Sequence, residues 1–545
     1  MAFHRAHVLV DTGTPAVLKG AIEVKSALVE EIRKRGLDKE IRVLETGDLG
    51  IHGGGPAVIV YPEGVTYAPV KAADVPEIVE EHLLKGRQVT RLLYAEESAS
   101  VVGGAAAPRC NELRVILKNV GVIDPTSIEE YIAVGGYDAV GKALTQMKPE
   151  DVITEVKASQ LKGRGGAGFP TGLKWSFVPK GTDRPKYLVC NADEGEPGTF
   201  KDRELIEKNP HGLIEGMILA AWAIQANDGY VYLRGEFGWL KEMLDRAIAE
   251  ACAAGLLGAD VAGTGFRFDL HTHLGAGAYI CGEETALLSS LEGCRGQPRL
   301  KPPFPAVEGL YRCPTIVNNV ETLVNVPHIL AHGAEWYRQW GTERSPGTKI
   351  FSVSGPVKRP GNHELPLGTP LRVLLEERCG GMRDGMTLQA VIPGGSSVPP
   401  LPAGLLDTPL DFESMAAAGT MLGSGGVIVI DAETCMVDAL RNLLRFYAHE
   451  SCGKCTPCRE GTYWISRILD RLEHGGGRPG DVELLADLAD NICGRSFCPL
   501  GDAAAMPVQG FLKHFRAEFD HHVEHGRCRV NRRRAELAAA AGGAR

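Results

Sequence analysis

The chain has 545 residues, more than one ordinary hydrophobic core holds together, so we expect several domains. Hydrophobic residues make up 44% and charged residues 23%, as in a globular protein, and the formal net charge of −9 argues against nucleic-acid binding. No apolar run approaches the ~20 residues that cross a bilayer and no export signal is recognisable, so the 14 cysteines predict reduced thiols or metal ligands in a soluble, cytoplasmic protein.

The first part of the chain predicts a small α/β domain over residues 1–105. Apolar positions indicate strands at 7–10, 41–44 and 57–61, with a turn at 62–64. Helical spacing of apolar residues predicts helices over 16–34 and 75–84. This order of elements is typical of a thioredoxin-like fold.

Three further domains and a tail follow. Residues 106–335 predict the longest α/β stretch, with a strand at 186–190. Residues 336–431 predict a small mixed module in which strands at 349–354 and 388–392 flank a helix at 370–377. Helical periodicity dominates 432–528 around a group of cysteines, and the basic, alanine-rich tail at 529–545 predicts a frayed terminus.

The strongest chemical signal is the triple Cys452, Cys455 and Cys458, with a further cysteine downstream. Three thiolates at two-residue gaps can reach one face of a cubane, and a distant fourth closes the ligand set of a [4Fe–4S] cluster. Structural zinc more often uses separated pairs, so the close triple favours iron–sulfur over zinc. Spacing alone leaves two candidates for the fourth ligand, Cys493 and Cys498.

A glycine-rich loop over 163–172 is the second signal. Gly163, Gly165 and Gly168 match the dinucleotide-binding pattern, but the preceding apolar residues have helical rather than strand spacing. We therefore predict a helix–loop–helix cradle in which backbone N–H groups approach a phosphate, with Lys174 adding a point charge. A merely flexible loop is the alternative.

Two acidic segments complete the candidate site. The strand at 186–190 leads into a cluster containing Asp193, Glu194 and Glu196, which either accepts hydrogen bonds from ribityl or ribose hydroxyls or is a solvated turn. A second glycine segment over 275–282 precedes Glu283 and Glu284, which either bind a cofactor or complement a helix dipole. His521, His522 and His525 predict a solvated helix rather than a metal site.

In this order, the four constellations resemble the family of flavin-containing, NADH-binding subunits of respiratory complex I, over about 110–528. The resemblance implies an α/β multidomain protein: a Rossmann-like FMN- and NAD(H)-binding domain, a β-grasp-like domain and a helical bundle that carries a [4Fe–4S] cluster. It selects Cys498 over Cys493, because Phe497 to Asp502 match the family's fourth-ligand segment.

The resemblance also assigns the cofactor contacts. FMN is expected at Gly163, Gly165, Lys174, Asn191, Asp193, Glu194, Gly282, Glu283, Asn318 and Asn319, with Gly166 and Thr322 beside them. NAD(H) is expected at Phe169, Lys174, Phe177, Glu196, Tyr279, Glu284, Lys301 and Phe304. Of these, Glu196, Lys174 and Glu284 are the expected catalytic residues. Glu196 and Glu284 are assigned to binding and tuning, because hydride exchange needs no protein acid or base.

The amino-terminal domain resembles the thioredoxin-like [2Fe–2S] domain of relatives, but Asp11, Ala16, Asp48 and His52 stand where those relatives have cysteines. These side chains cannot replace four thiolates, so no [2Fe–2S] cluster is expected and the domain is assigned to docking or assembly.

This fusion looks most like the beta subunit of a molybdenum-dependent, NAD-linked formate dehydrogenase. The expected partners are a molybdenum catalytic subunit and a [2Fe–2S] thioredoxin-like subunit. The diaphorase subunit of an NAD-reducing hydrogenase, a complex I subunit and a zinc-stabilised assembly scaffold are the alternatives.

Overall fold

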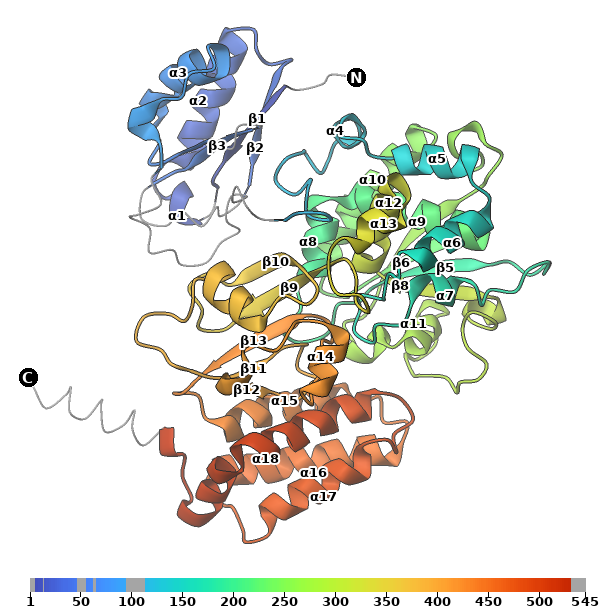
Figure 1. Cartoon of the computed structure of the whole chain (residues 1–545), viewed down its shortest axis with the longest axis vertical. Helices are drawn as coiled ribbons and strands as arrows, with labels where there is room; N and C mark the ends of the chain where they lie inside the picture. Colours follow the sequence, from blue (N-terminus) through green and yellow to red (C-terminus); the bar gives the residue numbers. More distant parts are fainter. Residues whose placement is uncertain (1–4, 13, 47–54, 62–64, 95–112, 531–545) are drawn as a thin grey trace, which may run out of the picture.

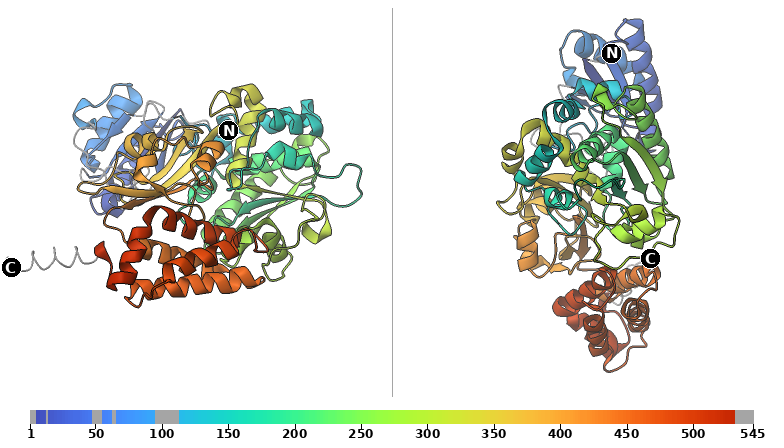
Figure 2. Two further views of the ribbon diagram at one scale, coloured as in Figure 1. Left: turned by 60° about the horizontal axis from the view of Figure 1, so that its bottom comes forward. Right: turned by 90° about the vertical axis from the view of Figure 1, so that its right-hand side faces the viewer.

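The computed structural model describes residues 5–12, 14–46, 55–61, 65–94 and 113–530. The chain forms four parts, of which the second and third lie side by side in the middle of the molecule (Figure 1). The amino-terminal domain and the carboxy-terminal helices lie at opposite ends, and the two middle parts lie between them (Figure 2). The mixed α/β, multidomain architecture expected from the sequence is confirmed.

The amino-terminal domain is a four-stranded sheet in the order β2-β1-β3-β4, in which β1 and β2 are parallel and the other pairs antiparallel. Alternate residues of β1 and β3 point to opposite faces, so Val8 and Val60 pack under the helices while Leu9 and Ile59 form a second small core. Its elements are β1 (Ala6–Val10), α1 (Thr14–Val17), α2 (Ala21–Lys34), β2 (Ile41–Glu45), β3 (Val58–Tyr61), β4 (Val65–Tyr67), η1 (Ala72–Asp74), α3 (Val75–Glu77), η2 (Ile78–Leu84) and η3 (Thr90–Leu92).

Two details of this domain differ from the sequence prediction. The expected helix over 16–34 is divided in two, because Gly20 has a left-handed backbone (φ +99°) and α2 begins at the next residue. Strand β4 was not predicted; its three residues are too few for a periodic pattern. The predicted turn at 62–64 lies outside the described residues.

The second part contains a parallel sheet in the order β7-β6-β5-β8. One face packs against α9, α10 and α12, and the other contacts α11 through Val189, Tyr232 and Val317. Its elements are α4 (Ile128–Ala133), α5 (Asp138–Gln146), α6 (Pro149–Ala158), α7 (Thr171–Trp175), β5 (Tyr187–Ala192), α8 (Lys201–Lys208), α9 (Pro210–Ile224), β6 (Asp228–Leu233), α10 (Gly238–Ala253), η5 (Val261–Gly263), β7 (Asp269–Leu274), η6 (Tyr279–Gly282), α11 (Glu284–Leu291), η7 (Leu310–Arg312), β8 (Thr315–Asn319), α12 (Val320–His332) and α13 (Ala334–Arg338).

The third part is a five-stranded sheet in the order β10-β9-β13-β11-β12. Its first long strand, β9, pairs in parallel with its last, β13, at the centre of the sheet, which is the arrangement of a β-grasp-like domain. Its elements are β9 (Thr348–Ser354), β10 (Gly361–Pro366), η8 (Val373–Arg378), β11 (Leu388–Ile392), β12 (Leu401–Pro402), η9 (Ala403–Leu405), α14 (Phe412–Ala417) and β13 (Gly426–Asp431).

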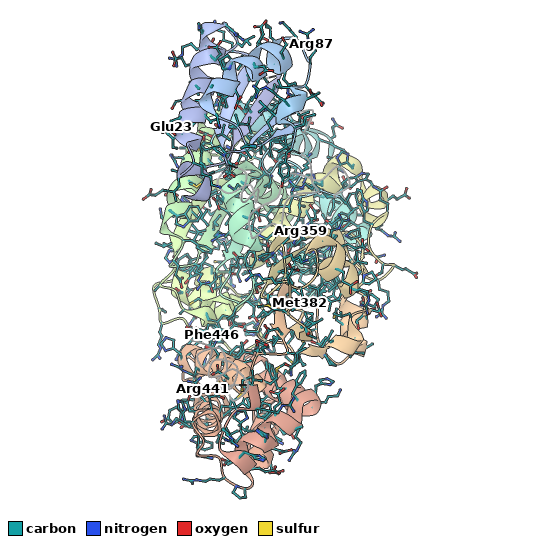
Figure 3. The ribbon with its side chains drawn as sticks, turned by 90° about the vertical axis from the view of Figure 1, so that its left-hand side faces the viewer. Glu23, Arg87, Arg359, Met382, Arg441 and Phe446 are labelled. Atoms are coloured by element: carbon teal, nitrogen blue, oxygen red, sulfur yellow. The ribbon has the colours of Figure 1, made fainter. Side chains whose placement is uncertain are left out.

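The last part is a bundle of α15 (Met436–Glu450), α16 (Thr456–Glu473), α17 (Asp481–Ile492) and α18 (Leu500–His525). Its apolar stripes share a core that continues into the second part through Ile280 and Leu287. Phe446 of α15 lies where the bundle meets the rest of the molecule (Figure 3) and packs edge-on against Tyr279, with ring centroids 5.0 Å apart. Within the described segments, every helix is too short or too polar to cross a membrane.

Candidate functional site

The candidate site lies where the parallel sheet reverses its strand order. Strands β5 and β8 are neighbours, although two strands separate them in sequence, and Asn191 pairs with Asn319 at their carboxyl ends. From β5 the chain continues to β6 on one side of β5, whereas β8 is added on the other side, so the strand order changes direction at the edge between β5 and β8. This is the position at which open α/β sheets bind ligands.

The glycine-rich loop closes over this edge. It joins α6 to α7, so the predicted helix–loop–helix arrangement is confirmed. The N–H of Gly163 donates to the carbonyl of Phe169 at 2.9 Å, which folds the loop back on itself. A Cβ on Gly165 would lie 3.1 Å from Cβ of Asn319, so the loop backbone rests directly against the end of β8. The N–H of Arg164 donates to Oγ1 of Thr322 at 2.8 Å.

Buried charges hold the loop from beneath, and sequence reasoning missed them. The guanidinium of Arg164 is fully buried and donates to the Tyr337 hydroxyl at 2.9 Å. Lys349 donates to the carbonyl of Arg164 at 3.1 Å, and Glu321 lies 2.9 Å from Lys201. Burial lowers the pKa of Lys349 to about 7, and Glu321 offsets only part of that effect. No local sequence pattern predicts this network, because its residues come from segments that are far apart in the chain.

Asp193 places a buried acceptor at the site. The Nδ2 group of Asn191 donates to the carbonyl of Gly282 at 2.8 Å and so joins the two predicted segments. The Oδ2 atom of Asp193 is buried without a hydrogen-bond partner, and a Cβ on Gly282 would lie 3.4 Å from it. Burial raises the pKa of Asp193 to about 7, with Arg234 acting in the opposite direction. A hydroxyl donor from a ligand is what this oxygen lacks.

Two other predicted contacts are used within the protein. Glu194 accepts the N–H groups of Asp202 at 2.6 Å and Arg203 at 2.9 Å, which caps the start of α8. Trp175 donates to Oδ1 of Asn318 at 2.8 Å. These side chains position the walls of the site.

A chain of charges runs along the start of α11. Lys174 donates to Glu284 at 2.8 Å and to the carbonyl of Val317 at 2.8 Å. Lys301 lies 3.1 Å from Glu284 and 2.8 Å from Glu283. Burial alone would raise the pKa of Glu284, but the two lysines outweigh it and hold the pKa below its usual value. Glu283 also caps α11, so the dipole-complement interpretation applies to it in part.

Glu196 lies where three parts of the chain meet. It accepts the Tyr279 hydroxyl at 2.6 Å and the N–H of Ser397, from the β-grasp-like domain, at 2.8 Å. Tyr447 of α15 joins through Ser396, at 2.7 Å between the two hydroxyls. Burial raises the pKa of Glu196, and these hydrogen bonds offset only part of it. Sequence reasoning missed Ser396 and Ser397, which belong to another predicted domain.

The predicted aromatic contacts are exposed. Phe169 is 47% and Phe177 50% exposed, and their ring centroids are 6.2 Å apart. Phe304 is 58% exposed. Accessible ring faces of this kind suit stacking on a planar ligand. A Cβ added at Gly166 would meet no atom within 4 Å, so the backbone there is open as well.

The four predicted cluster cysteines line one small cavity, which Cys493 does not line; the other lining residues are Ile280, Pro298, Ser451, Lys454, Phe497 and Leu500. Among the described residues, no three of these four sulfurs lie mutually within 4.8 Å. One tetrahedral zinc with bonds of ~2.3 Å would draw its sulfurs to about 3.8 Å from one another. The spread therefore fits a larger inorganic group better than a single ion.

The cavity adjoins the first site. Ile280 lines it, and the preceding residue, Tyr279, bonds to Glu196. Arg295 and Gln297 both donate to the carbonyl of Cys452 at 3.2 Å, so the sheet domain clamps the cysteine loop. Burial raises the pKa of Cys458 to about 11 and that of Cys498 to about 12, so metal binding must expel their protons.

Comparison with known proteins gives this geometry a family. Residues 156–328 match the Nuo51 FMN-binding domain, 349–430 the SLBB domain, and 438–522 the NADH-ubiquinone oxidoreductase-F iron–sulfur binding region. An NADH-quinone oxidoreductase F subunit of Rhizobium meliloti (strain 1021), the one numbered 2, is 56% identical over 414 residues, 76% of this chain and 98% of that protein. The chain belongs to this family of NADH-quinone oxidoreductase F subunits.

Two other relatives extend the comparison. The NADH-quinone oxidoreductase F subunit of Mycobacterium tuberculosis (strain ATCC 25618 / H37Rv) is 56% identical over 408 residues, 74% of this chain and 91% of that protein. A chain of an NAD+-reducing [NiFe]-hydrogenase in the H2-reduced state is 33% identical and has a TM-score of 0.67. The match covers 98% of this chain and 87% of the hydrogenase chain.

As an F-type subunit, the chain is an oxidoreductase component that binds FMN and a [4Fe–4S] cluster and takes NADH as its substrate. The site fits FMN on its own observations. The unpartnered Asp193 oxygen lacks a hydroxyl donor, and the glycine loop leaves the backbone at Gly166 open to an anion. The β-grasp-like domain is the SLBB domain.

The solvated-helix interpretation of the histidines is wrong for His522, which is 1% exposed and contacts Cys435, whereas His525 is exposed as expected. In the amino-terminal domain, Asp11 and Ala16 are buried, but Asp48 and His52 lie outside the described residues, so the absence of a [2Fe–2S] cluster stays a prediction.

Proposed function

We propose that the chain is the NAD+-reducing module of a hetero-oligomeric, molybdenum-dependent formate dehydrogenase. Electrons from partner subunits enter at the cysteine cavity and leave as hydride on NAD+. The observation that supports the electron relay in this proposal is the adjacency of the two sites, because Tyr279 contacts Glu196 while Ile280 lines the cavity. A site for two-electron exchange and a site for one-electron transfer thus share one short segment, η6.

When bound, FMN exchanges hydride with nicotinamide and passes electrons on singly. The protein's own part is binding and orientation. The N–H of Gly163 folds the loop by bonding to Phe169, the backbone at Gly165 and Gly166 offers N–H groups to the phosphate, and Asp193 accepts a ribityl hydroxyl. Asn319 and Thr322 support the loop from the end of β8.

Three residues orient the nicotinamide cofactor in this proposal. Lys174 and Glu284 form a partly buried pair at 2.8 Å that can bind ribose hydroxyls, Glu284 as acceptor and Lys174 as donor, without a net change in charge. Glu196 fixes Tyr279 and the SLBB domain around the pocket for the pyridine ring. The exposed rings of Phe169, Phe177 and Phe304 stack on the adenine half. None of them acts as a proton donor.

The fused amino-terminal domain supports a formate- or hydrogen-linked complex over complex I. The match to the Rhizobium relative covers 98% of that protein but 76% of this chain. Nearly the whole relative therefore aligns with this chain, and about a quarter of this chain has no counterpart in the match. The hydrogenase chain covers 98% of this chain. That match supports the diaphorase subunit of an NAD-reducing hydrogenase as the second candidate. The assignment to formate dehydrogenase depends on the family resemblance and on the replaced cysteines of the amino-terminal domain.

The experiment is anaerobic purification of the intact complex with its partners. Formate-dependent NAD+ reduction, together with molybdenum, supports the proposal, as does co-purification of a [2Fe–2S] thioredoxin-like subunit. Hydrogen-dependent reduction with nickel assigns the chain to the hydrogenase class instead. A colourless chain with neither iron nor flavin would leave the scaffold alternative.

A further inference from the structure

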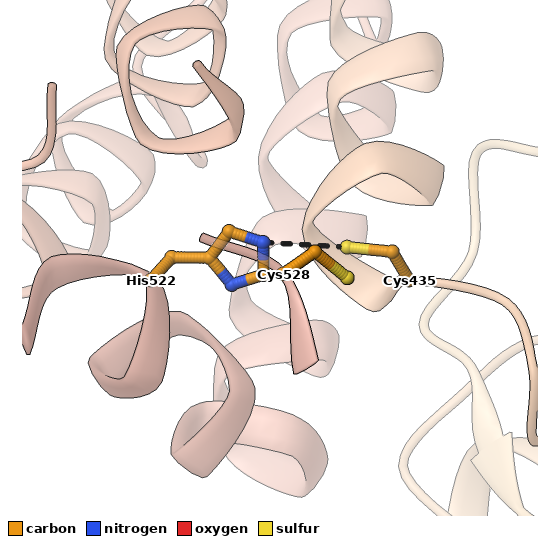
Figure 4. A group of neighbouring side chains, drawn as sticks. All are labelled: Cys435, His522 and Cys528. Carbon is orange, nitrogen blue, oxygen red and sulfur yellow. Dashed lines mark hydrogen bonds between the residues drawn. The ribbon is translucent and has the colours of Figure 1, made fainter. Parts of the chain in front are cut away.

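A second group of metal-ligating side chains lies in the helical bundle, apart from the cluster cavity. Cys435 precedes α15, His522 lies in the last turn of α18, and Cys528 follows that helix (Figure 4). Their side chains are 7%, 1% and 5% exposed. Their ligand atoms all lie within 4.8 Å of one another, unlike those of the cluster cysteines.

Glu473, at the end of α16, lies beside two members of the group, Cys435 and His522, and supplies a fourth candidate ligand. Its Oε2 lies 3.5 Å from Sγ of Cys435 and 3.4 Å from Nε2 of His522, and the sulfur lies 3.5 Å from that nitrogen. A tetrahedron with Zn–S bonds of ~2.3 Å and Zn–N or Zn–O bonds of ~2.0 Å has edges of about 3.5 Å from sulfur and about 3.3 Å between the lighter ligands. The three observed edges match these lengths.

The ring of His522 is already oriented for this role. Its Nδ1 lies 2.8 Å from the carbonyl of Glu518, which can only accept, so Nδ1 carries the proton. In the neutral ring the free lone pair is then on Nε2, the atom that faces Cys435. Metal-ligating histidines are held in the same way, by donation from the other ring nitrogen to a carbonyl.

We propose that Cys435, His522, Cys528 and Glu473 bind one Zn2+ ion. Two thiolates, an imidazole and a carboxylate suit zinc, whereas Mg2+ and Ca2+ prefer all-oxygen ligands. The ion displaces the two thiol protons, which pass to solvent, and no electron is transferred. The site is closed by four protein ligands, so its role is structural: it fastens the ends of α15, α16 and α18 and the segment after α18 to one another.

Metal analysis of the full-length protein tests this without any activity measurement. We expect one zinc per chain beside the iron of the cluster. Zinc K-edge absorption should show two sulfurs at ~2.3 Å and two lighter atoms at ~2.0 Å. Cys528→Ser should lower the zinc content by about tenfold or more and leave iron and flavin in place. Cys498→Ser should do the reverse, losing iron and keeping zinc.

Cys252→Ser is the matched control, because Cys252 is an exposed thiol outside both groups, and it should retain both metals. Should Cys528→Ser fail to fold, chelator release from the wild-type chain decides: one equivalent of zinc should appear, with a lower melting temperature and unchanged iron. Wild-type protein without zinc after growth in zinc-supplemented medium overturns the proposal. So does a disulfide between Cys435 and Cys528, or zinc retained after either is replaced.

Discussion

At the scale of single residues, the candidate site contains a few desolvated carboxyl groups whose pKa values are raised. Asp193 has an acceptor oxygen with no partner and a pKa of about 7, because burial disfavours its charge. Glu196 is partly buried, its pKa is raised by desolvation, and it accepts donors from two domains. Such environments are common at functional sites, since the same burial that raises a pKa strengthens the interaction with a bound ligand.

The raised pKa of Asp193 predicts a pH dependence. Without flavin, the free energy of unfolding should fall as the pH rises from about 4 to about 7, because over this interval the unfolded chain ionises Asp193 while the folded chain keeps it protonated. An ionised carboxylate accepts a ribityl hydroxyl more strongly than a protonated one, so we expect the affinity of the apoprotein for FMN to rise over the same interval and level off above it. Asp193→Asn should remove this dependence in flavin-fluorescence titrations, while Asp228→Asn, at the far end of β6, keeps it. A pH-independent wild type contradicts the assignment.

A second prediction concerns Glu196→Gln. The amide has one acceptor oxygen, so either the Tyr279 hydroxyl or the Ser397 N–H loses its partner, at about 1–3 kcal/mol. We expect the KM for NADH to rise by about tenfold, with FMN and iron content unchanged, in steady-state assays with ferricyanide. The exposed Glu308→Gln is the control. Unchanged KM and turnover would remove Glu196 from the site.

At the scale of elements, loops and helix starts bring the site together. The glycine loop between α6 and α7, the start of α11 and the ends of β5 and β8 meet at one edge of the sheet. The loop also contacts the SLBB domain, because Gly168 has φ +68° and a Cβ there would lie 2.5 Å from the ring of Phe412 in α14.

Gly168→Ala should therefore damage flavin binding. The left-handed backbone costs a non-glycine residue ~1 kcal/mol or more, and the methyl group forces Phe412 and the loop apart. We expect a lower melting temperature and substoichiometric FMN, measured by thermal unfolding and by flavin absorbance. Gly141→Ala, in α5 with open space around the added methyl, should keep both. Full flavin occupancy in Gly168→Ala contradicts the close contact.

At the scale of the whole molecule, the sites lie in the middle and carboxy-terminal parts, and the amino-terminal domain stands apart from them (Figure 1). Its described contacts with the FMN domain include His7 with Glu130 at 2.8 Å and Arg42 with Asp124 at 2.5 Å. This position leaves the domain free to dock partners while the redox groups stay together.

Deletion of residues 1–105 should separate these roles. None of the proposed FMN, NAD(H) or cluster contacts lies in that domain, so the shortened chain should keep flavin and iron and reduce ferricyanide with NADH at the full-length rate. Partner-dependent NAD+ reduction should be lost, because docking is lost. The double variant His7→Ala/Arg42→Ala, which keeps the domain, should retain the partners. Loss of flavin on deletion would refute an assembly role.

Much of the site was predictable because its chemistry is local in sequence. The cysteine triple, the glycine loop and the acidic run after β5 each lie within about a dozen residues, and short spacing alone restricts what they can bind. The strands at 186–190 and 388–392 and the helices of the bundle were likewise readable, since burial on one face imposes a period on the sequence.

The order of residues was enough to predict an iron–sulfur cluster, a phosphate-binding loop and successive α/β, mixed and helical parts, because motifs and hydrophobic periods are properties of neighbouring residues, whereas FMN was implied by the family resemblance. The folded chain was needed to show that Arg164, Lys349 and Glu321 support the loop, that Ser397 completes the surroundings of Glu196, and that His522 meets Cys435. These contacts join segments from 29 to 201 residues apart. No local pattern encodes such pairs, since packing of whole domains decides them.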